Sequence, residues 1–415
     1  MTASAGPTRR AFLAGTTGLA ASVALARWSK ALAATPSGLR HPDSLPDPSR
    51  PAGTPDPRVP IDHVIVVMME NHSFDNYLGL LARRGQPAAD GFTFDGAGKP
   101  SNSNPTTGGV IRSFHMPSEC QMEFSPSQAW TTTRTSIDGG AMTGFVKASG
   151  DVAMGYWDDH DLPFYYSLAK TFSLANRWFA SATVQTYPNR RFLMAGTAYG
   201  LIGSDLPGVN DAGPPNGTIF DRLNQHGISW KNYFTDLPEL AIIPSAAKAN
   251  LTHLSPITQF FVDAAAGQLP ALSLVDPDFG IIDAIGSRIP GIPPPSTINA
   301  QGTDEENPQN VQFGEQFVAT VVDAVIRSPN WPRTLLVWLY DEHGGYYDHV
   351  PPPAAIAPDN IAPRLGPKDT PGDYDLYGVR VPAVVVSPWS KPASVTSVVH
   401  DHTSVLAFVE QKWNL

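Results

Sequence analysis

The sequence predicts an α/β fold built around a mostly parallel sheet. Two stretches carry this prediction: residues 63–69, HVIVVMM, and residues 334–340, TLLVWLY, are apolar runs without the alternation of a half-exposed strand. Segments with helical patterns lie between and after them. Buried strands interleaved with helices are typical of a parallel sheet that helices cover on both faces.

The first expected helix spans residues 161–172, where Asp161 would cap the helix and Pro163 would lie in its first turn. Residues 311–328 have apolar side chains at helical spacing and lead directly into the strand at 334–340. Together they predict a helix followed by a buried strand.

A third strand is expected at residues 380–389, with Pro382 marking its start or an edge position. Residues 402–413 have the pattern of an amphipathic helix that closes the chain, and His402 is expected to support its beginning.

Composition indicates a globular protein with a sizeable core and argues against nucleic acid as a partner. The chain has 415 residues, 42% of them hydrophobic, which is enough for a sizeable core. A net charge of −10 and the lack of a basic run argue against nucleic acid and against docking on an anionic membrane. Peripheral contact with a neutral or zwitterionic lipid surface stays open, as does the oligomeric state. Cys120 is the one cysteine, so no internal disulfide forms.

The N-terminus predicts an export signal. Arg9 and Arg10 precede an Ala/Gly-rich apolar run, and small residues make Ala33 a suitable cleavage point. We interpret residues 1–33 as a twin-arginine signal peptide rather than a membrane anchor, because the run is short and poor in Leu, Ile and Val. Residues 34–60 are a Pro-rich lead-in, and residues 61–415 are expected to form a single catalytic domain.

Polar side chains follow two of the expected strands where those strands end. Glu70 and Asn71 follow the first, and Asp341, Glu342 and His343 follow the second. The carboxyl ends of parallel strands meet at one edge of a sheet, and carboxylate and amide oxygens are the donors that hard cations prefer. Turn or capping roles are the alternative for each piece alone.

A hydroxyl near such an ion would be a candidate nucleophile. Thr186 precedes a Pro-Asn turn, and Arg190 follows at a spacing suited to holding phosphate oxygens. The alternative is that Thr186 caps a helix and the arginine lies on the surface. His72 is expected at the surface or rim. Asp276 is expected in a turn, with a supporting position near the site as the alternative.

Six motifs resemble those of the bacterial phosphoesterase family, which holds non-specific phospholipases C and secreted acid phosphatases. They occur in the family's order over roughly residues 60–415, and together they are specific where one alone is not. In this chain they read MMENHSFDNYLG, MGYWDDHDLPFYYSLA, TYPNRRF, YDEHGGYYDHVPPP, RVPAVVVSPW and HDHTSVLAFVE.

The resemblance implies an alkaline-phosphatase-like three-layer α/β/α sandwich with a mostly parallel central sheet. It also implies one divalent metal ion, of which Ca, Mg, Mn, Fe and Zn all remain open, and a phospho-threonine intermediate on Thr186. His343 becomes a candidate proton donor to the leaving group, with a purely supporting role as the alternative. By motif, the implied metal ligands are Glu70, Asn71, Asp341 and Glu342.

Two positions depart from the family pattern. Gln128 and Glu306 stand where members often carry histidines, and both places are expected to contact substrate phosphate. The leading hypothesis is a phospholipase C that releases diacylglycerol and a phosphorylated headgroup. An acid phosphatase acting on small monoesters and a catalytically weakened binding protein on the same scaffold are the alternatives.

Overall fold

A parallel sheet forms the centre of the computed structural model, which describes residues 44–121, 126–205, 208, 212–280 and 302–415. Its strand order is β12-β6-β11-β10-β1-β9-β7-β8. Strand β11 is antiparallel to both neighbours, and the remaining neighbours pair in parallel. The predicted α/β class with a mostly parallel sheet is confirmed. The strands are β1 His63–Met69, β6 Ser173–Ala175, β7 Trp230–Phe234, β8 Leu254–Pro256, β9 Leu272–Val275, β10 Thr334–Tyr340, β11 Ala383–Val386 and β12 Val395–Thr396.

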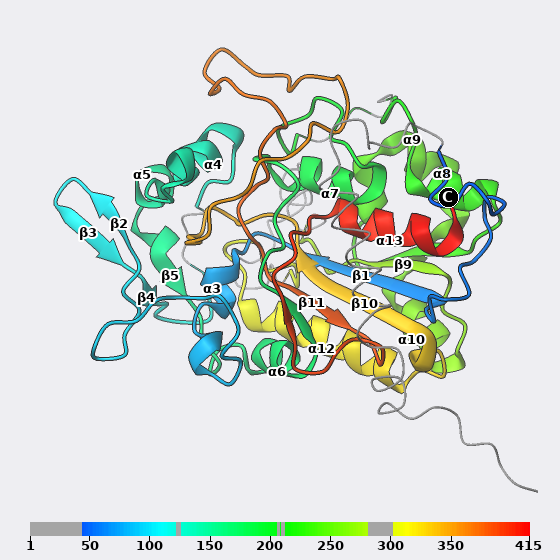
Figure 1. Ribbon diagram of the computed structural model, residues 1–415, viewed down its shortest axis with the longest axis horizontal. Helices are drawn as coiled ribbons and strands as arrows, with labels where there is room; N and C mark the ends of the chain where they lie inside the picture. The colour runs from blue at the N-terminus through cyan, green and yellow to red at the C-terminus, as the bar shows by residue number, and fades with distance from the viewer. Residues whose placement is uncertain (1–43, 122–125, 206–207, 209–211, 281–301) are drawn as a thin grey trace, which may run out of the picture. The chain divides into compact units, whose positions relative to one another are not determined.

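Helices cover both faces of this sheet (Figure 1). Helices α7, α8 and α13 lie on one side, and α6, α10 and α12 lie on the other, with α12 packed directly on β10. These helices are α6 Pro163–Thr171, α7 Thr186–Ala195, α8 Ile219–Gln225, α10 Ile257–Ala266, α12 Val311–Arg327 and α13 Thr403–Trp413. The short helices are α3 Phe74–Leu78 and α9 Pro244–Ala249.

Strands β1 and β10 have the bounds that their apolar runs predicted. They pair in parallel from His63 opposite Thr334 to Met69 opposite Tyr340, and both are almost wholly buried. Their carboxyl ends therefore lie at the same level of the sheet. Strand β11 begins directly after Pro382, as expected, but it spans only Ala383–Val386 of the predicted 380–389. It runs antiparallel to β10, so its carboxyl end lies at the opposite side of the sheet from those of β1 and β10.

A small group of elements stands beyond the end of the sheet, at the left of Figure 1. Its hairpin packs against helix α5, and α5 packs against α4. Its elements are β2 Ser103–Thr106, β3 Gly109–Arg112, β4 Phe114–His115, β5 Gly155–Tyr156, α4 Trp130–Ile137 and α5 Phe145–Ser149.

The expected helices at 311–328 and 402–413 are confirmed within one residue at each end. The capping role predicted for Asp161 is wrong, because the residue before the first turn of α6 is Leu162. The Asp161 carboxylate instead accepts hydrogen bonds from the backbone N–H of Asp158 (2.8 Å) and from His115 Nε2 (2.7 Å). Pro163 does begin the helix.

The predicted signal peptide, residues 1–33, lies outside the described residues. From residue 44 to 60 the lead-in has turns and bends but neither helix nor strand, as expected. Residues Arg50–Leu415 form a compact unit in which Asp56 N–H donates to Lys412 O (2.6 Å), and the domain start at residue 61 stays a prediction. Across the described residues, every helix is too short or too polar to cross a bilayer.

A network of buried charged side chains connects three of the six sequence motifs. The Arg380 guanidinium, which is 0% exposed, donates to both Asp348 carboxylate oxygens (3.1 Å) and to Asp75 Oδ1 (3.1 Å). His349 Nδ1 lies 2.7 Å from Asp75 Oδ2. These contacts connect α3, the loop after β10 and the segment that leads into β11. The first two of these segments follow the carboxyl ends of β1 and β10.

Replacing Arg380 by glutamine is expected to lower the free energy of unfolding by about 3–5 kcal/mol, because two buried carboxylates lose their cation. Urea unfolding followed by circular dichroism measures the change. Arg327→Gln is the matched control: Arg327 pairs with Asp323 on the helix surface, and its side chain is 78% exposed. That control should change stability by less than about 0.5 kcal/mol. A similar small loss for both variants would contradict the importance of the network.

Candidate active site

Acidic side chains converge where β1 and β10 end. Glu70 follows β1 and Asp341 follows β10, and the Asp341 N–H still donates to Met69 O (3.1 Å). Asn71 has a left-handed backbone, with φ of 69°, and its N–H donates to Asp341 Oδ1 (3.1 Å). The two strand ends are thus locked side by side, as the parallel pairing requires.

The two glycines that follow the acids after β10 have a left-handed backbone. Gly344 has φ of 61° and Gly345 has φ of 82°. A Cβ atom on Gly344 would lie 2.0 Å from Asn71 O. A larger residue at this position would therefore push the two strand ends apart.

Thr186 is brought to this edge by the first turn of α7. It is the first helical residue, after the cap position at Gln185, and its Oγ1 lies 3.4 Å from Asn71 Oδ1. The Asn189 side chain accepts from Ala182 N–H (3.2 Å) and donates to Val184 O (2.8 Å), which fixes the chain entering the helix. The hydroxyl therefore lies beside the acidic edge, with the positive end of the helix dipole behind it.

Arg190 is buried among carboxylates rather than exposed. It lies 3.1 Å from Asp341 Oδ2, 3.2 Å from Glu70 Oε1 and 3.4 Å from Glu239 Oε2. Its guanidinium also donates to Met69 O (3.2 Å). The alternative of a surface arginine is excluded, and these contacts favour a role in holding the acids over the predicted contact with phosphate, which stays a prediction.

A segment before α12 adds two more acids to the edge. Glu70 N–H donates to Asp304 O (3.0 Å), and Glu306 N–H donates to Asp304 Oδ1 (3.1 Å). Ligand atoms of Glu70, Asp304 and Glu306 lie within 4.8 Å of one another. Asp304 was not singled out from the sequence, although the run TDEEN before a helix could have drawn attention to it.

The sheet's next strand contributes a further buried acid. Asp276 follows β9, is 1% exposed, and accepts hydrogen bonds at Oδ2 from Asn232 Nδ2 (2.6 Å) and Glu239 N–H (2.6 Å). The expected turn role for Asp276 is wrong, because its carboxylate anchors the 3₁₀ turn Glu239–Ile242 beside the site.

The carboxylates at the carboxyl ends of β1 and β10 carry more negative charge than the guanidinium of Arg190 can neutralise. Burial raises the pKa of Glu70 well above its ordinary value; Arg190 opposes this rise, and Asp341 adds to it. Burial disfavours the charge on Arg190, yet Glu239 and Asp341 together hold its pKa above the ordinary value. Asp304 Oδ2 and Glu342 Oε1 are buried without a hydrogen-bond partner. An oxygen-rich site with orphaned acceptors and excess negative charge fits a hard divalent cation.

A cavity of about 350 Å³ opens onto this edge. Glu70, Thr186 and Arg190 line it, together with Gln128 and Glu306, so both positions that depart from the family pattern reach the cavity. Apolar side chains complete much of the lining: Leu237, Pro238, Ala241, Ile242 and Phe279.

His343 lies behind the acids. It is 1% exposed, its Nδ1 lies 3.1 Å from Glu342 Oε2, and burial lowers its pKa to about 3. It is not among the described residues that line the cavity. This placement favours orienting Glu342 over the predicted proton transfer to substrate, which stays a prediction.

Two other histidines support the edge from within the core. His72 is 0% exposed and stacks between the rings of Tyr77 and Tyr346, so the expectation of a surface or rim position is wrong. His402 lies at the start of α13, where its Nε2–H donates to Asp341 O (2.7 Å). Tyr346, which covers one face of His72, and Asp341, which His402 contacts, are distant in sequence, so the local pattern does not show that these rings are buried.

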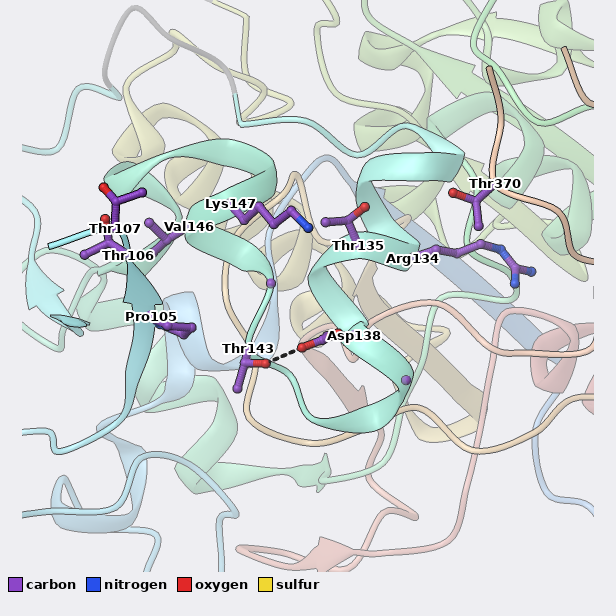
Figure 2. A pocket seen from close by; sticks show the side chains of 12 residues that line it. Pro105, Thr106, Thr107, Arg134, Thr135, Asp138, Thr143, Val146, Lys147 and Thr370 are labelled. Atoms are coloured by element: carbon purple, nitrogen blue, oxygen red, sulfur yellow. Dashed lines mark hydrogen bonds between the residues drawn. The ribbon is translucent and has the colours of Figure 1, made fainter. Parts of the chain in front are cut away.

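A second, larger cavity of about 810 Å³ lies between α4, α5 and the tip of the β2–β3 hairpin (Figure 2). Threonine side chains dominate its wall, with Arg134, Lys147 and Asp138 around them, and Thr143 donates to Asp138 Oδ2. Asp138 is the one carboxylate among its described lining residues, and it has no cluster of acids beside a hydroxyl. The smaller cavity has such a cluster and is therefore the candidate active site.

Comparison with known sequences points in the same direction. The Phosphoesterase family model matches residues 61–415. The chain is similar to non-specific phospholipase C1 of Arabidopsis thaliana, at 31% identity over 386 residues that cover 86% of this chain and 67% of that protein. It is also similar to non-hemolytic phospholipase C of Pseudomonas aeruginosa, at 27% identity over 86% of this chain and 54% of that protein. The chain spans about half the length of this bacterial relative.

Solved structures are more distant. The chain is similar to the lipoteichoic acid synthase LtaP of Listeria monocytogenes, with a TM-score of 0.39 and 9% identity over 85% of this chain and 72% of that one. A protein in the alkaline phosphatase superfamily from Vibrio parahaemolyticus gives a TM-score of 0.36 and 11% identity, covering 80% and 74%. Scores this low carry no argument, so the α/β class rests on the sheet itself, and the alkaline-phosphatase-like arrangement stays a prediction.

Divalent cations are expected to raise the thermal midpoint of the protein, and Asp304→Asn should remove most of that rise while leaving the chelated protein about as stable as before. The reason is that Asp304 contributes an orphaned oxygen to the acidic edge. Scanning calorimetry with chelator and with saturating cation measures both midpoints, and a metal-dependent difference of about 1–3 kcal/mol is expected.

The matched control is Asp323→Asn on the exposed face of α12, which should keep the full metal-dependent rise. Equal metal-dependent rises in all three proteins would show that Asp304 takes no part in cation binding.

Proposed function

Because the chain belongs to the phosphoesterase family, whose members hydrolyse phosphoric ester bonds, we propose that it is a metal-dependent phospholipase C acting through a phospho-threonine intermediate. The observation that carries this proposal is the Thr186 hydroxyl, 3.4 Å from Asn71 Oδ1, in a cavity that both acidic and apolar side chains line. A nucleophile, an oxygen-rich cation site and an apolar surface are the three things such a reaction requires.

Glu70, Asn71, Asp341 and Glu342 would hold the ion, with Asp304 adding a further oxygen. A bound divalent ion would favour ionisation of the threonine hydroxyl and offset charge on the phosphoryl oxygens. The chain's own contribution is placement: the first turn of α7 fixes Thr186, and Arg190 keeps neighbouring carboxylates at the edge despite their mutual repulsion.

In the first step Thr186 Oγ1 gives up its proton to water and forms a bond to phosphorus, and the bond from phosphorus to the glycerol oxygen breaks. The glycerol oxygen takes up a proton from an acidic side chain and leaves as diacylglycerol. In the second step a water oxygen bonds to phosphorus and returns a proton to that side chain, the threonine–phosphorus bond breaks, and Thr186 takes up a proton from water as the phosphorylated headgroup departs.

The proton for the glycerol oxygen is best supplied by Glu306. Gln128 and Glu306 both line the cavity at the places where the family often has histidines. An amide donates a hydrogen bond but does not give up a proton, whereas a carboxyl group that still holds its proton does, and burial raises the pKa of Glu306 above its ordinary value. We therefore assign proton transfer to Glu306 and hydrogen bonding of a phosphate oxygen to Gln128.

The apolar part of the cavity lining favours a phospholipid over a small monoester. Leu237, Ile242 and Phe279 line the same cavity as Thr186 and would be left bare by an inorganic-like substrate. The phospholipase names of the relatives agree with this choice. Retention of Thr186 and of all four implied metal ligands argues against a binding protein that has lost its chemistry.

Thr186→Ala is expected to lower kcat with phosphatidylcholine by at least about 10³-fold, because the nucleophile is removed. Thr186→Ser should retain most of the rate, since its hydroxyl can attack in the same place. The test uses the mature protein with phosphatidylcholine vesicles and with a chromogenic phosphate monoester, each with and without chelator.

Thr171→Ala on the exposed side of α6 is the control and should behave like the wild-type protein. Full activity of Thr186→Ala would refute the nucleophile. Turnover of the monoester alone would favour the acid phosphatase, and no turnover of either substrate with cation present would refute both enzymes.

Glu306→Gln is expected to slow phosphatidylcholine hydrolysis by about 10²–10⁴-fold, the usual worth of a positioned acid. With a nitrophenyl phosphodiester, whose leaving group departs without a proton, the loss should shrink to about tenfold or less. The comparison of the two substrates measures the role. Equal losses with both would show that Glu306 does not protonate the leaving group.

A further inference from the structure

In the sequence Glu305 lies between Asp304 and Glu306, two acids of the candidate site, but its own side chain is directed away from that site. Asp304 and Glu306 belong to the acidic edge, whereas the Glu305 side chain enters the core and is 0% exposed. Its backbone has φ of 74°, a left-handed conformation that costs a non-glycine residue about 1–3 kcal/mol. A conformation of that cost persists only where surrounding contacts hold it.

Three tyrosine hydroxyls hold the Glu305 carboxylate. Tyr165 donates to Oε1 (2.6 Å), Tyr77 donates to Oε2 (2.9 Å), and Tyr340 also donates to Oε2. We call Tyr77, Tyr165 and Tyr340 the tyrosine clamp. They come from α3, α6 and β10, so the clamp connects three separate elements to one side chain, and no ion pair reaches Glu305 from the described residues.

The backbone of the same residue is held as well. Glu305 O accepts from Gln121 Nε2 (2.6 Å) and from His72 Nε2 (3.0 Å). Tyr346 OH in turn donates to Gln121 Oε1 (3.1 Å) and covers the His72 ring. Side chain and carbonyl are therefore fixed independently, which leaves the segment no freedom to relax its strained backbone.

A glycine inside α12 provides the space for this side chain. A Cβ atom on Gly314 would lie 2.2 Å from Glu305 Cγ and 2.3 Å from its Oε1. Glycine inside a helix costs about 1 kcal/mol relative to alanine. Gly314 therefore serves the placement of Glu305 rather than the stability of the helix.

We propose that Glu305 is a positioning residue, and that the tyrosine clamp acts through it to hold Asp304 and Glu306 at the acidic edge. This inference rests on the proposed function, since Asp304 is there a metal ligand and Glu306 the proton donor. Supporting contacts of this kind commonly change metal affinity by about 10–100-fold. Each tyrosine of the clamp belongs to a different sequence motif, and none of the three takes part in the proposed reaction. Holding Glu305 gives these tyrosines a role.

The test compares Tyr165→Phe with Tyr166→Phe in the mature protein. Both residues are fully buried neighbours on α6, but the Tyr166 hydroxyl forms no hydrogen bond to Glu305 in the described structure. Equilibrium dialysis measures the Kd for Ca²⁺, Mg²⁺, Mn²⁺, Fe²⁺ and Zn²⁺ in turn, and kinetics at saturating cation give kcat and KM for phosphatidylcholine.

Tyr165→Phe is expected to weaken binding of the cation that the wild-type protein holds most tightly by about tenfold, and to lower kcat while KM stays within about twofold. Tyr166→Phe should match the wild type in every value. Wild-type cation affinity in Tyr165→Phe would overturn the inference while leaving the proposed function intact. A wild-type protein that binds none of the five cations would instead overturn the proposed metal site, and the inference with it.

Gly314→Ala gives a second test that does not touch a hydroxyl. It should weaken cation binding at least as much as Tyr165→Phe, because the new methyl group displaces Glu305. In a Glu305→Ala background the same substitution should have no further effect on cation affinity, since the side chain it strikes is gone. Equal effects of Gly314→Ala in the two backgrounds would overturn the inference.

Discussion

One buried guanidinium makes the rest of the site possible. Parallel strands deliver several carboxylates to one edge of a sheet, where low polarity magnifies their repulsion. Arg190 lies among Glu70, Glu239 and Asp341 and also binds the last carbonyl of β1. It offsets part of the charge and fixes the distance between the acids and the strand end. Because Arg190 and Thr186 share the first turns of α7, the same helix places the guanidinium and the proposed nucleophile.

Most motif residues around the site support it rather than react. Asp75, Asp348 and Arg380 form a closed network behind the strand ends, and His402 binds the carbonyl of Asp341. Each contact joins segments far apart in the sequence to the edge of the sheet. A site that must hold like charges close together needs such bracing, because every misplaced carboxylate would relax away from the others.

The sequence predicts the parts of this structure that are local and leaves out those that depend on distant contacts. Continuous or periodic apolar patterns predict strands β1 and β10 and helices α12 and α13. The predicted ends of the two strands in turn give the positions of the acids that follow them. Strands β6 and β12 have three and two residues, too few for any pattern. Asp304 was missed because Glu70, its neighbour at the site, is distant in sequence. The burial of His72 was missed because Tyr346 and the Glu305 carbonyl, which complete its surroundings, are distant as well. Motif resemblance alone identified Gln128 and Glu306.

The charge balance of the site explains why positions 128 and 306 matter. A histidine at either place would be able to carry positive charge beside a phosphate group, but glutamine carries none and Glu306 adds a carboxyl group. Arg190 lines the cavity, yet its guanidinium already serves three carboxylates. On the proposed mechanism, charge on the phosphoryl oxygens is therefore offset mainly by the bound cation. Precise placement of its ligands then decides the rate, and for Asp304 that placement depends on Glu305 and the tyrosine clamp.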